Sequence, residues 1–82
     1  MAIPIKIKLA AVRVNAGFSQ EDLARKMNVS RVTIANWESY KTKMSDADVM
    51  MFSAVCSFPV EYIFLPYLLL NFVNYNLISS IN

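Results

Sequence analysis

Few residues in this 82-residue sequence could carry out catalytic or metal chemistry. The chain contains no histidine and a single cysteine, Cys56. This composition excludes disulfides within the chain, zinc sites built from cysteine and histidine, and Ser-His or Cys-His catalysis. A lone cysteine is most often a buried core residue, and it is consistent with a reducing compartment. We therefore expect no enzymatic activity, no metal ion and no cofactor.

The chemistry that remains is that of the basic side chains, which are concentrated in one part of the chain. All eight Lys and Arg residues lie within the first 43 positions together with three acidic residues, so this segment has a net charge of +5. The remainder carries three acidic residues and no basic one, and no charge follows Glu61. A basic segment of this kind favours a polyanionic partner.

Short helices must position these basic side chains, because apolar residues recur at helical spacing and only one glycine interrupts the chain. Capping and helix-breaking residues predict five helices, which run from Pro4 to Gly17, from Ser19 to Asn28, from Ser30 to Ser39, from Ser45 to Cys56 and from Val60 to Phe64. Ser19 and Asp22 can form a capping box, and Asn28 tolerates positive φ. The second and third helices, joined by so tight a turn, form a helix-turn-helix.

The apolar residues on one side of each helix form the predicted core of a single domain, since 82 residues are too few for two cores. The residues expected to point inward are Ile5, Leu9, Val12, Ala16, Leu23, Ala24, Met27, Ile34, Trp37, Val49, Met50, Phe52, Ala54 and Val55, and Met44 and Met51 are also expected to fill the core. Hydrophobic residues make up 56% of the chain, which excludes disorder.

The carboxyl-terminal part, residues 66–82, is an apolar tail whose helical and strand periodicities cannot be separated, with a slight preference for extended or mixed structure. The uncharged stretch 62–82 is nominally long enough to cross a bilayer, but Pro66, asparagines and serines interrupt it. A core or subunit contact is the favoured interpretation, with Tyr67, Leu68, Leu70, Phe72 and Tyr75 as the contact residues. The amino terminus lacks the long apolar core of a signal peptide, so a cytoplasmic location is expected.

The run from Gln20 to Glu38 resembles the helix-turn-helix of the Cro and CI phage repressors and their bacterial relatives. The resemblance rests on a small residue, Ala24, where the two helices cross, an apolar Val29 in the turn, and Ile34, Trp37 and Glu38 in the third helix. It extends over residues 5–65, which include the Tyr-Ile-Phe-Leu-Pro sequence at 62–66. The resemblance implies an all-α, five-helix domain of the lambda-repressor type over residues 1–65, followed by the tail.

The resemblance also implies that the third helix lies in the major groove of operator DNA in a bacterial host. Carried over by position, Arg31, Val32 and Asn36 would contact bases: arginine suits guanine, asparagine suits adenine, and valine suits the thymine methyl group. The residues that would contact the DNA backbone are Gln20, Thr33, Ser39, Lys41 and Lys43. Arg13 and Glu38 would form a structural ion pair.

This sequence departs from the family pattern at two positions, with Tyr40 where the family usually has glycine and Met44 where it often has proline. The third helix is also thinly polar, because Ser30–Ser39 contains one arginine and one glutamate. Three functions follow from these observations. The leading hypothesis is a Cro-type, sequence-specific DNA-binding regulator that acts as a homodimer. The alternatives are an antirepressor that binds a partner phage repressor through the helix-turn-helix surface, and a regulator anchored to a membrane by its tail.

Overall fold

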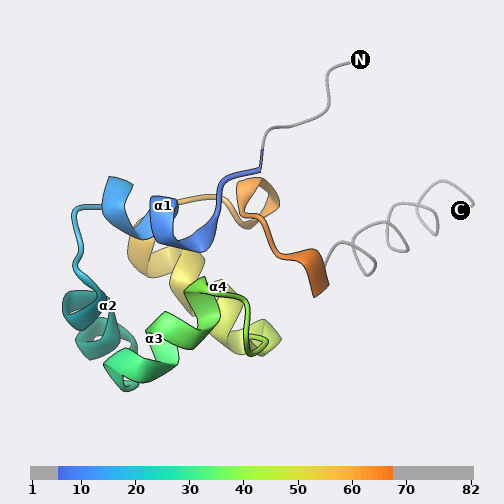
Figure 1. The fold of residues 1–82 in the computed structure, drawn as a ribbon. Coiled ribbons are helices and arrows are strands. Elements are labelled where there is room, and N and C mark those ends of the chain that lie inside the picture. Colours follow the sequence, from blue (N-terminus) through green and yellow to red (C-terminus); the bar gives the residue numbers. More distant parts are fainter. Residues whose placement is uncertain (1–5, 68–82) are drawn as a thin grey trace, which may run out of the picture.

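The computed structural model describes residues 6–67, and within this range the chain forms four α-helices and one turn of 3-10 helix. The elements are α1 (Leu9–Asn15), α2 (Gln20–Met27), α3 (Arg31–Glu38), α4 (Asp46–Cys56) and η1 (Val60–Tyr62). Figure 1 shows α2 and α3 stacked at one end of the domain, with α1 above α3 and α4 behind it. The all-helical prediction is confirmed for these residues, whereas the predicted count of five α-helices is not.

The first helix is shorter than predicted, because Ile7 is in extended backbone. Ile7 forms a parallel bridge with Ile63: its N–H donates to the Tyr62 carbonyl and its carbonyl accepts from Phe64 N–H, both at 2.7 Å. Helix α1 therefore begins at Leu9 instead of Pro4, and Pro4 and Ile5 lie outside the described residues. The helix is followed by Gly17 in the left-handed region, at φ 87°, as the sequence indicates.

The same bridge explains why the predicted fifth helix is absent. Val60–Tyr62 forms a single 3-10 turn, and Ile63 and Phe64 then leave the helical conformation. The two hydrogen bonds with Ile7 satisfy the Tyr62 carbonyl and the Phe64 N–H, which would otherwise need partners within a longer helix. Sequence periodicity in this stretch did not reveal a pairing with a residue 56 positions earlier.

The ends of the middle helices are fixed by the predicted capping residues. Ser19 Oγ accepts from Asp22 N–H at 3.0 Å and the Asp22 carboxylate accepts from Ser19 N–H at 3.1 Å, so the predicted capping box is confirmed. Ser45 and Asp48 form a second box at the start of α4. Asn28 ends α2 at φ 58°, and Ser30 caps α3 by accepting from Thr33 N–H. Local chemistry therefore determines where α2, α3 and α4 begin.

The core lies between α1, α2, α3 and α4 and is closed by residues that follow η1. Its buried members are Leu9, Val12, Leu23, Ala24, Met27, Ile34, Trp37, Met44, Val49, Phe52, Cys56, Ile63 and Leu65. Trp37 and Met44 are core residues, as predicted. The prediction is wrong for Met50, Met51 and Ala54, which are exposed. The buried face of α4 is formed by Val49, Phe52 and Cys56, so residues one position away point out of the domain.

No helix within residues 6–67 has the length and apolar character needed to span a membrane. The tail residues predicted to contact another subunit, Leu68, Leu70, Phe72 and Tyr75, lie outside the described residues. Tyr67 lies inside them and packs against the core of its own chain. Its hydroxyl accepts a hydrogen bond from Met44 N–H at 3.1 Å. The packing of the described residues therefore includes Tyr67.

Candidate nucleic-acid interface

The second and third helices are held at a fixed angle by a turn of three residues, Asn28 to Ser30. Asn28 adopts a left-handed conformation, and Val29, which follows it, packs against the core. Val29 N–H also donates to the Ala24 carbonyl at 3.0 Å, which ties the turn to the end of α2. Ala24 is buried beneath this turn, where a larger side chain would push the helices apart. This geometry leaves the first turn of α3 on the surface.

The outer face of α3 carries the residues predicted to contact bases. Arg31 and Val32 are exposed, with 58% of Val32 accessible, and Asn36 is half-buried one turn later. Ile34 and Trp37 on the opposite face are buried, so the helix cannot rotate without exposing them. The structure therefore places Arg31, Val32 and Asn36 on an accessible face and fixes its orientation through the core.

A chain of polar contacts joins the exposed arginine of α3 to the interior of the domain. Arg31 Nη1 donates to Gln20 Oε1 at 3.0 Å, and Gln20 Nε2 donates to Glu38 Oε1 at 3.0 Å. Glu38 Oε2 lies 2.5 Å from Arg13 Nε, and Arg13 Nη1 also donates to the Phe18 carbonyl at 2.9 Å. The side chains of Arg13 and Glu38 are only 14% and 8% exposed. Glu38 is therefore neutralised inside the domain.

Gln20 has a second role that its position in the sequence does not indicate. The resemblance places it on the DNA backbone, but in this structure its amide joins Arg31 of α3 to Glu38 at the end of the same helix. An amide can do this because it presents an acceptor oxygen and donor hydrogens on one planar group. Gln20 thus orients Arg31, and this contact could be found only once the two helices had been placed.

The remaining residues predicted to contact the DNA backbone differ in their surroundings. Lys41 and Lys43 are exposed in the loop between α3 and α4. Ser39 is also exposed, and its hydroxyl donates to the Asn36 carbonyl at 3.2 Å. Thr33 is half-buried, and its hydroxyl shares a 2.9 Å hydrogen bond with Ser30 Oγ. The two lysines are therefore accessible cations after the end of α3, whereas Thr33 is partly engaged in capping the helix.

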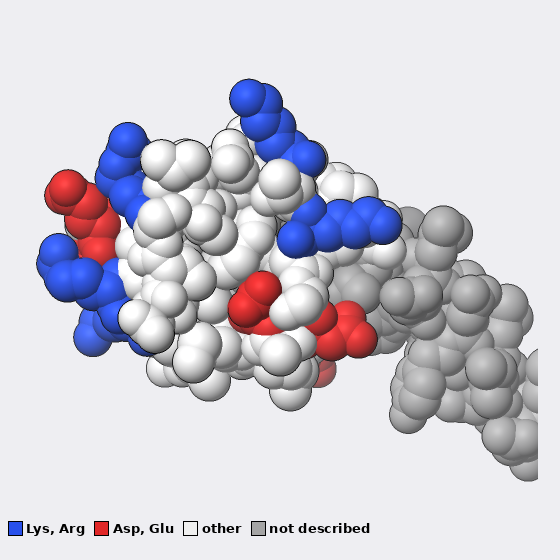
Figure 2. Space-filling model, turned by 90° about the horizontal axis from the view of Figure 1, so that it is seen from below, with Lys and Arg blue, Asp and Glu red and all other residues white. Residues whose placement is uncertain are grey.

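The charges around α3 lie at the edges of an otherwise uncharged surface. Figure 2, which views the domain from the α3 side, shows separate groups of Lys and Arg side chains with uncharged residues between them. Acidic side chains lie close to these basic groups in the same view. Such a pattern suits phosphates at the edges of a groove and base edges at its centre.

Tyr40 is a structural residue next to this surface that the sequence marks only as unusual. It has φ 61°, a left-handed conformation that glycine adopts more readily than other residues. Its hydroxyl accepts from Leu9 N–H at 3.1 Å and donates to the Phe64 carbonyl at 2.7 Å. Its ring also meets Phe64 edge to face, with centroids 5.6 Å apart. Burial raises the pKa of the Tyr40 hydroxyl, so it stays protonated and able to donate.

Within residues 6–67, no group of three or more potential ligands is arranged to hold a metal ion. Cys56 is buried, and desolvation raises the pKa of its thiol. A thiol of this kind has little thiolate character and is a poor nucleophile.

Comparison with known proteins identifies the family of the chain. A helix-turn-helix family model matches residues 9–63, which include all the helices within the described residues. No match was found among curated proteins or among solved structures. The matched range runs from the first residue of α1 to the residue that pairs with Ile7, and so covers the domain around the candidate interface. The chain therefore belongs to the helix-turn-helix family of the Cro and CI type, a family of DNA-binding transcription regulators.

Proposed function

We propose that the chain is a Cro-type regulator that binds a specific operator in double-stranded DNA, acting as a homodimer in the cytoplasm of a bacterial or phage-infected cell. The observation that carries the proposal is the exposed first turn of α3, where Arg31 is held by Gln20 and flanked by Val32. This turn presents a cation, hydrogen-bond donors and an apolar group on one rigid helix. Those are the groups with which proteins distinguish base pairs in the major groove.

The charge of α3 supports a DNA partner. The helix carries one basic and one acidic residue, and the acidic one, Glu38, is paired with Arg13 inside the domain. The charge that α3 presents to a partner is therefore that of Arg31 alone. Lys41 and Lys43 in the following loop add two further exposed cations. A DNA phosphate backbone would meet net positive charge on this side of the domain.

The experiment that tests this function starts from a random duplex library, because the operator is not specified by the structure. Duplexes retained by the protein at low salt are sequenced, and the enriched site is titrated by fluorescence anisotropy over a range of salt concentrations. We expect one enriched sequence and an affinity that falls steeply as salt rises. Failure to enrich any sequence, with no binding at low salt, would refute the proposal.

Matched variants separate the two kinds of contact. Arg31→Ala and Asn36→Ala should relax the preference at single base pairs by roughly 1–3 kcal/mol each. Lys41→Ala and Lys43→Ala should weaken binding to all sequences and reduce its salt dependence. Lys8→Ala is the control, because Lys8 is exposed at the start of α1 and its side chain makes no capping hydrogen bond.

One observation favours the second candidate, an antirepressor that binds a partner phage repressor through α3. Val32 is one of the most exposed large apolar residues of the described chain, and an apolar group in this position also suits a protein surface. Co-expression with a repressor encoded beside this gene, followed by size-exclusion chromatography, tests the idea. Separate elution at micromolar concentration would reject it. The membrane-anchored alternative concerns mainly residues outside the described range and stays a prediction.

A further inference from the structure

The outward face of α4 is apolar from Ala47 to Ala54 and has no partner among residues 6–67. Its surface residues Ala47, Met50, Met51 and Ala54 are all exposed and recur at the spacing of one helical stripe, which we call the α4 stripe. Met50 is 63% exposed and Met51 46%. No charged residue of α4 follows Asp48. The other large exposed apolar residues, Val14, Val32 and Tyr62, lie on three different elements.

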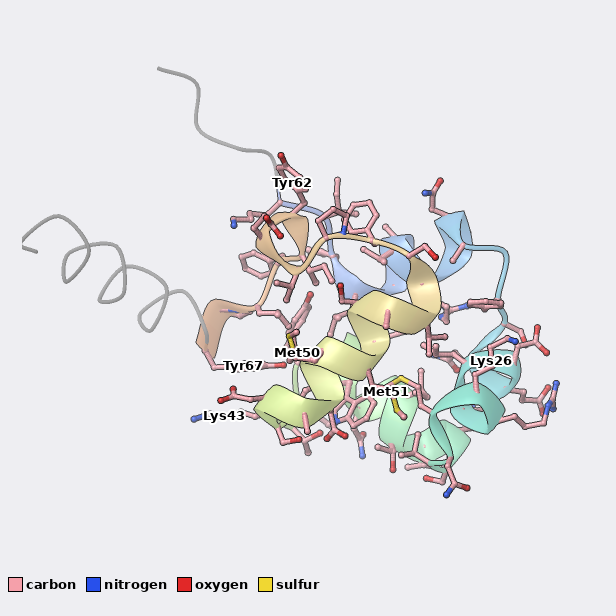
Figure 3. The ribbon with its side chains drawn as sticks, turned by 180° about the vertical axis from the view of Figure 1, so that it is seen from behind. Lys26, Lys43, Met50, Met51, Tyr62 and Tyr67 are labelled. Atoms are coloured by element: carbon pink, nitrogen blue, oxygen red, sulfur yellow. The ribbon has the colours of Figure 1, made fainter. Side chains whose placement is uncertain are left out.

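The α4 stripe lies away from the candidate DNA interface. Figure 3 views the domain from behind Figure 1 and brings α4 to the front, with α3 behind it. In this view Met50 lies on the side of α4 nearer Tyr67, and Met51 lies on the side nearer Lys26. Lys26 and Lys43 are found towards the edges of this face, as polar residues are at the rim of protein interfaces. A partner on the stripe would leave α3 free.

The sequence beyond Tyr67 has the composition that suits this stripe. Residues 68–82 carry no charge, and nine of these fifteen residues are aliphatic or aromatic. The stripe from Ala47 to Ala54 is about 10 Å long, given the rise of 1.5 Å per helical residue. A fifteen-residue segment spans more than this length in any regular conformation, since a helix of that size is about 22 Å long. The segment is therefore long enough to cover the stripe.

The position of Tyr67 indicates which copy provides the segment. Its hydroxyl is held by Met44 N–H, two residues before α4 begins, and the chain between η1 and Tyr67 runs towards this end of α4 (Figure 3). Because this segment runs against the direction of α4, the chain would have to turn back after Tyr67 to cover its own stripe. The next three residues are leucines, and residues 68–82 contain neither glycine nor proline. A second copy of the chain can reach the stripe without this reversal.

We propose that the α4 stripe is the docking site for residues 68–82 of a second copy, so that two chains exchange their tails across a two-fold axis. Each copy then contributes one stripe and one tail, as an isologous interface requires. The exchange covers the surplus apolar surface of both copies. This inference rests on the homodimer of the proposed function and names the surface that forms it.

The test measures dimerisation of the full chain without DNA, by sedimentation equilibrium. We expect the wild type to dimerise, and Met50→Glu with Met51→Glu to raise the dimer dissociation constant by roughly a hundredfold, because unpaired carboxylates would be buried. Val14→Glu is the matched control, since Val14 is equally exposed at 62% but lies on α1. Far-UV circular dichroism and thermal melting verify that each variant folds.

Mixing two defective variants distinguishes exchange from covering within one chain. A fluorescent copy with Met50→Glu and Met51→Glu keeps the wild-type tail, residues 68–82. A second copy with Phe72→Glu and Tyr75→Glu keeps the wild-type α4 stripe. We expect the mixture to form heterodimers at concentrations where each variant alone is monomeric.

Three results would overturn the inference: a wild type that remains monomeric at about 100 µM, an unchanged dissociation constant in the stripe variant, or a mixture that does not associate. Because no DNA is present in these measurements, loss of operator binding would refute the proposed function without affecting this result.

Discussion

The hydroxyl of Tyr40 donates to the carbonyl of Phe64 at 2.7 Å and thereby joins the turn that follows α3 to the segment that follows η1. The same oxygen accepts from the N–H of Leu9, the first residue of α1. One side chain therefore connects three parts of the chain that are distant in sequence. This explains how a tyrosine can be accommodated at φ 61°, where a non-glycine residue is strained.

The first prediction concerns this hydroxyl. Tyr40→Phe should lower the free energy of unfolding by about 1–3 kcal/mol, because the N–H of buried Leu9 and the Phe64 carbonyl lose their shared partner. The measurement is urea denaturation followed by circular dichroism. Tyr62→Phe is the control, since Tyr62 is 45% exposed on η1. Equal stability of the two variants would show that the hydroxyl of Tyr40 contributes nothing.

A second prediction follows from the left-handed backbone of Tyr40. Tyr40→Gly restores the residue that the family usually has and relieves strain of roughly 1 kcal/mol. It also removes the hydroxyl and a half-buried ring that packs on Phe64. We therefore expect Tyr40→Gly to be less stable than Tyr40→Phe in the same urea assay. A glycine variant as stable as the wild type would mean that backbone strain outweighs the ring and its hydrogen bonds.

The third prediction concerns the ion pair between Arg13 and Glu38, which is largely shielded from solvent. Glu38→Gln should destabilise the domain by roughly 3 kcal/mol, because it leaves the Arg13 guanidinium buried without a counter-charge. The double variant Arg13→Met with Glu38→Leu should lose less stability than Glu38→Gln alone. A double-mutant cycle built on urea denaturation measures the coupling. Additive effects of the two changes would contradict the interpretation of Glu38 as a buried partner.

The success and failure of the sequence predictions have a common physical basis. Where structure is set by neighbours in sequence, as in the capping boxes at Ser19 and Ser45 or the left-handed Asn28, residue type alone predicts it. The bridge between Ile7 and Ile63 depends on a contact across the whole domain, so both ends of the fold were mispredicted as helix. Helix α4 was predicted correctly, but its two methionines, which were predicted to be buried, are exposed.

In the candidate site, too, features set by neighbours in sequence could be predicted and features set by tertiary packing could not. The resemblance to the family indicates the outer face of α3 and the residues that occupy it, because that pattern is local. The amide of Gln20 between Arg31 and Glu38 depends on the packing of α2 against α3. Likewise, Tyr67 was predicted to contact another subunit, yet within the described chain its hydroxyl meets Met44. Sequence position alone does not distinguish these alternatives for a polar or aromatic side chain.

The fourth prediction tests the role of Gln20 in positioning Arg31. If the proposed DNA binding is correct, Gln20→Ala should reduce discrimination at the base pair contacted by Arg31, because the guanidinium loses the acceptor that orients it. The loss should be about 1 kcal/mol, the value of a typical hydrogen bond. Glu21→Ala is the control, since Glu21 is exposed and adjacent on the same helix. Competition between the selected operator and single-base variants measures the effect, and equal discrimination in the two variants would reject the positioning role.

The last prediction concerns pH and the capping box of α2. The hydrogen bonds from Ser19, together with nearby Arg25, hold the pKa of Asp22 below its usual value. A carboxyl group with a lowered pKa in the folded state stabilises the fold above its unfolded pKa of 3.8, and this contribution is lost as pH falls through the lower, folded value. We therefore expect the urea midpoint of the wild type to fall more steeply below pH 4 than that of Asp22→Asn, whose amide does not titrate in this range. The urea midpoints of the wild type and of Asp22→Asn should therefore converge as the pH is lowered. Parallel pH profiles, or an Asp22 carboxyl that titrates at or above 3.8 by NMR, would show that the capping box does not contribute in this way.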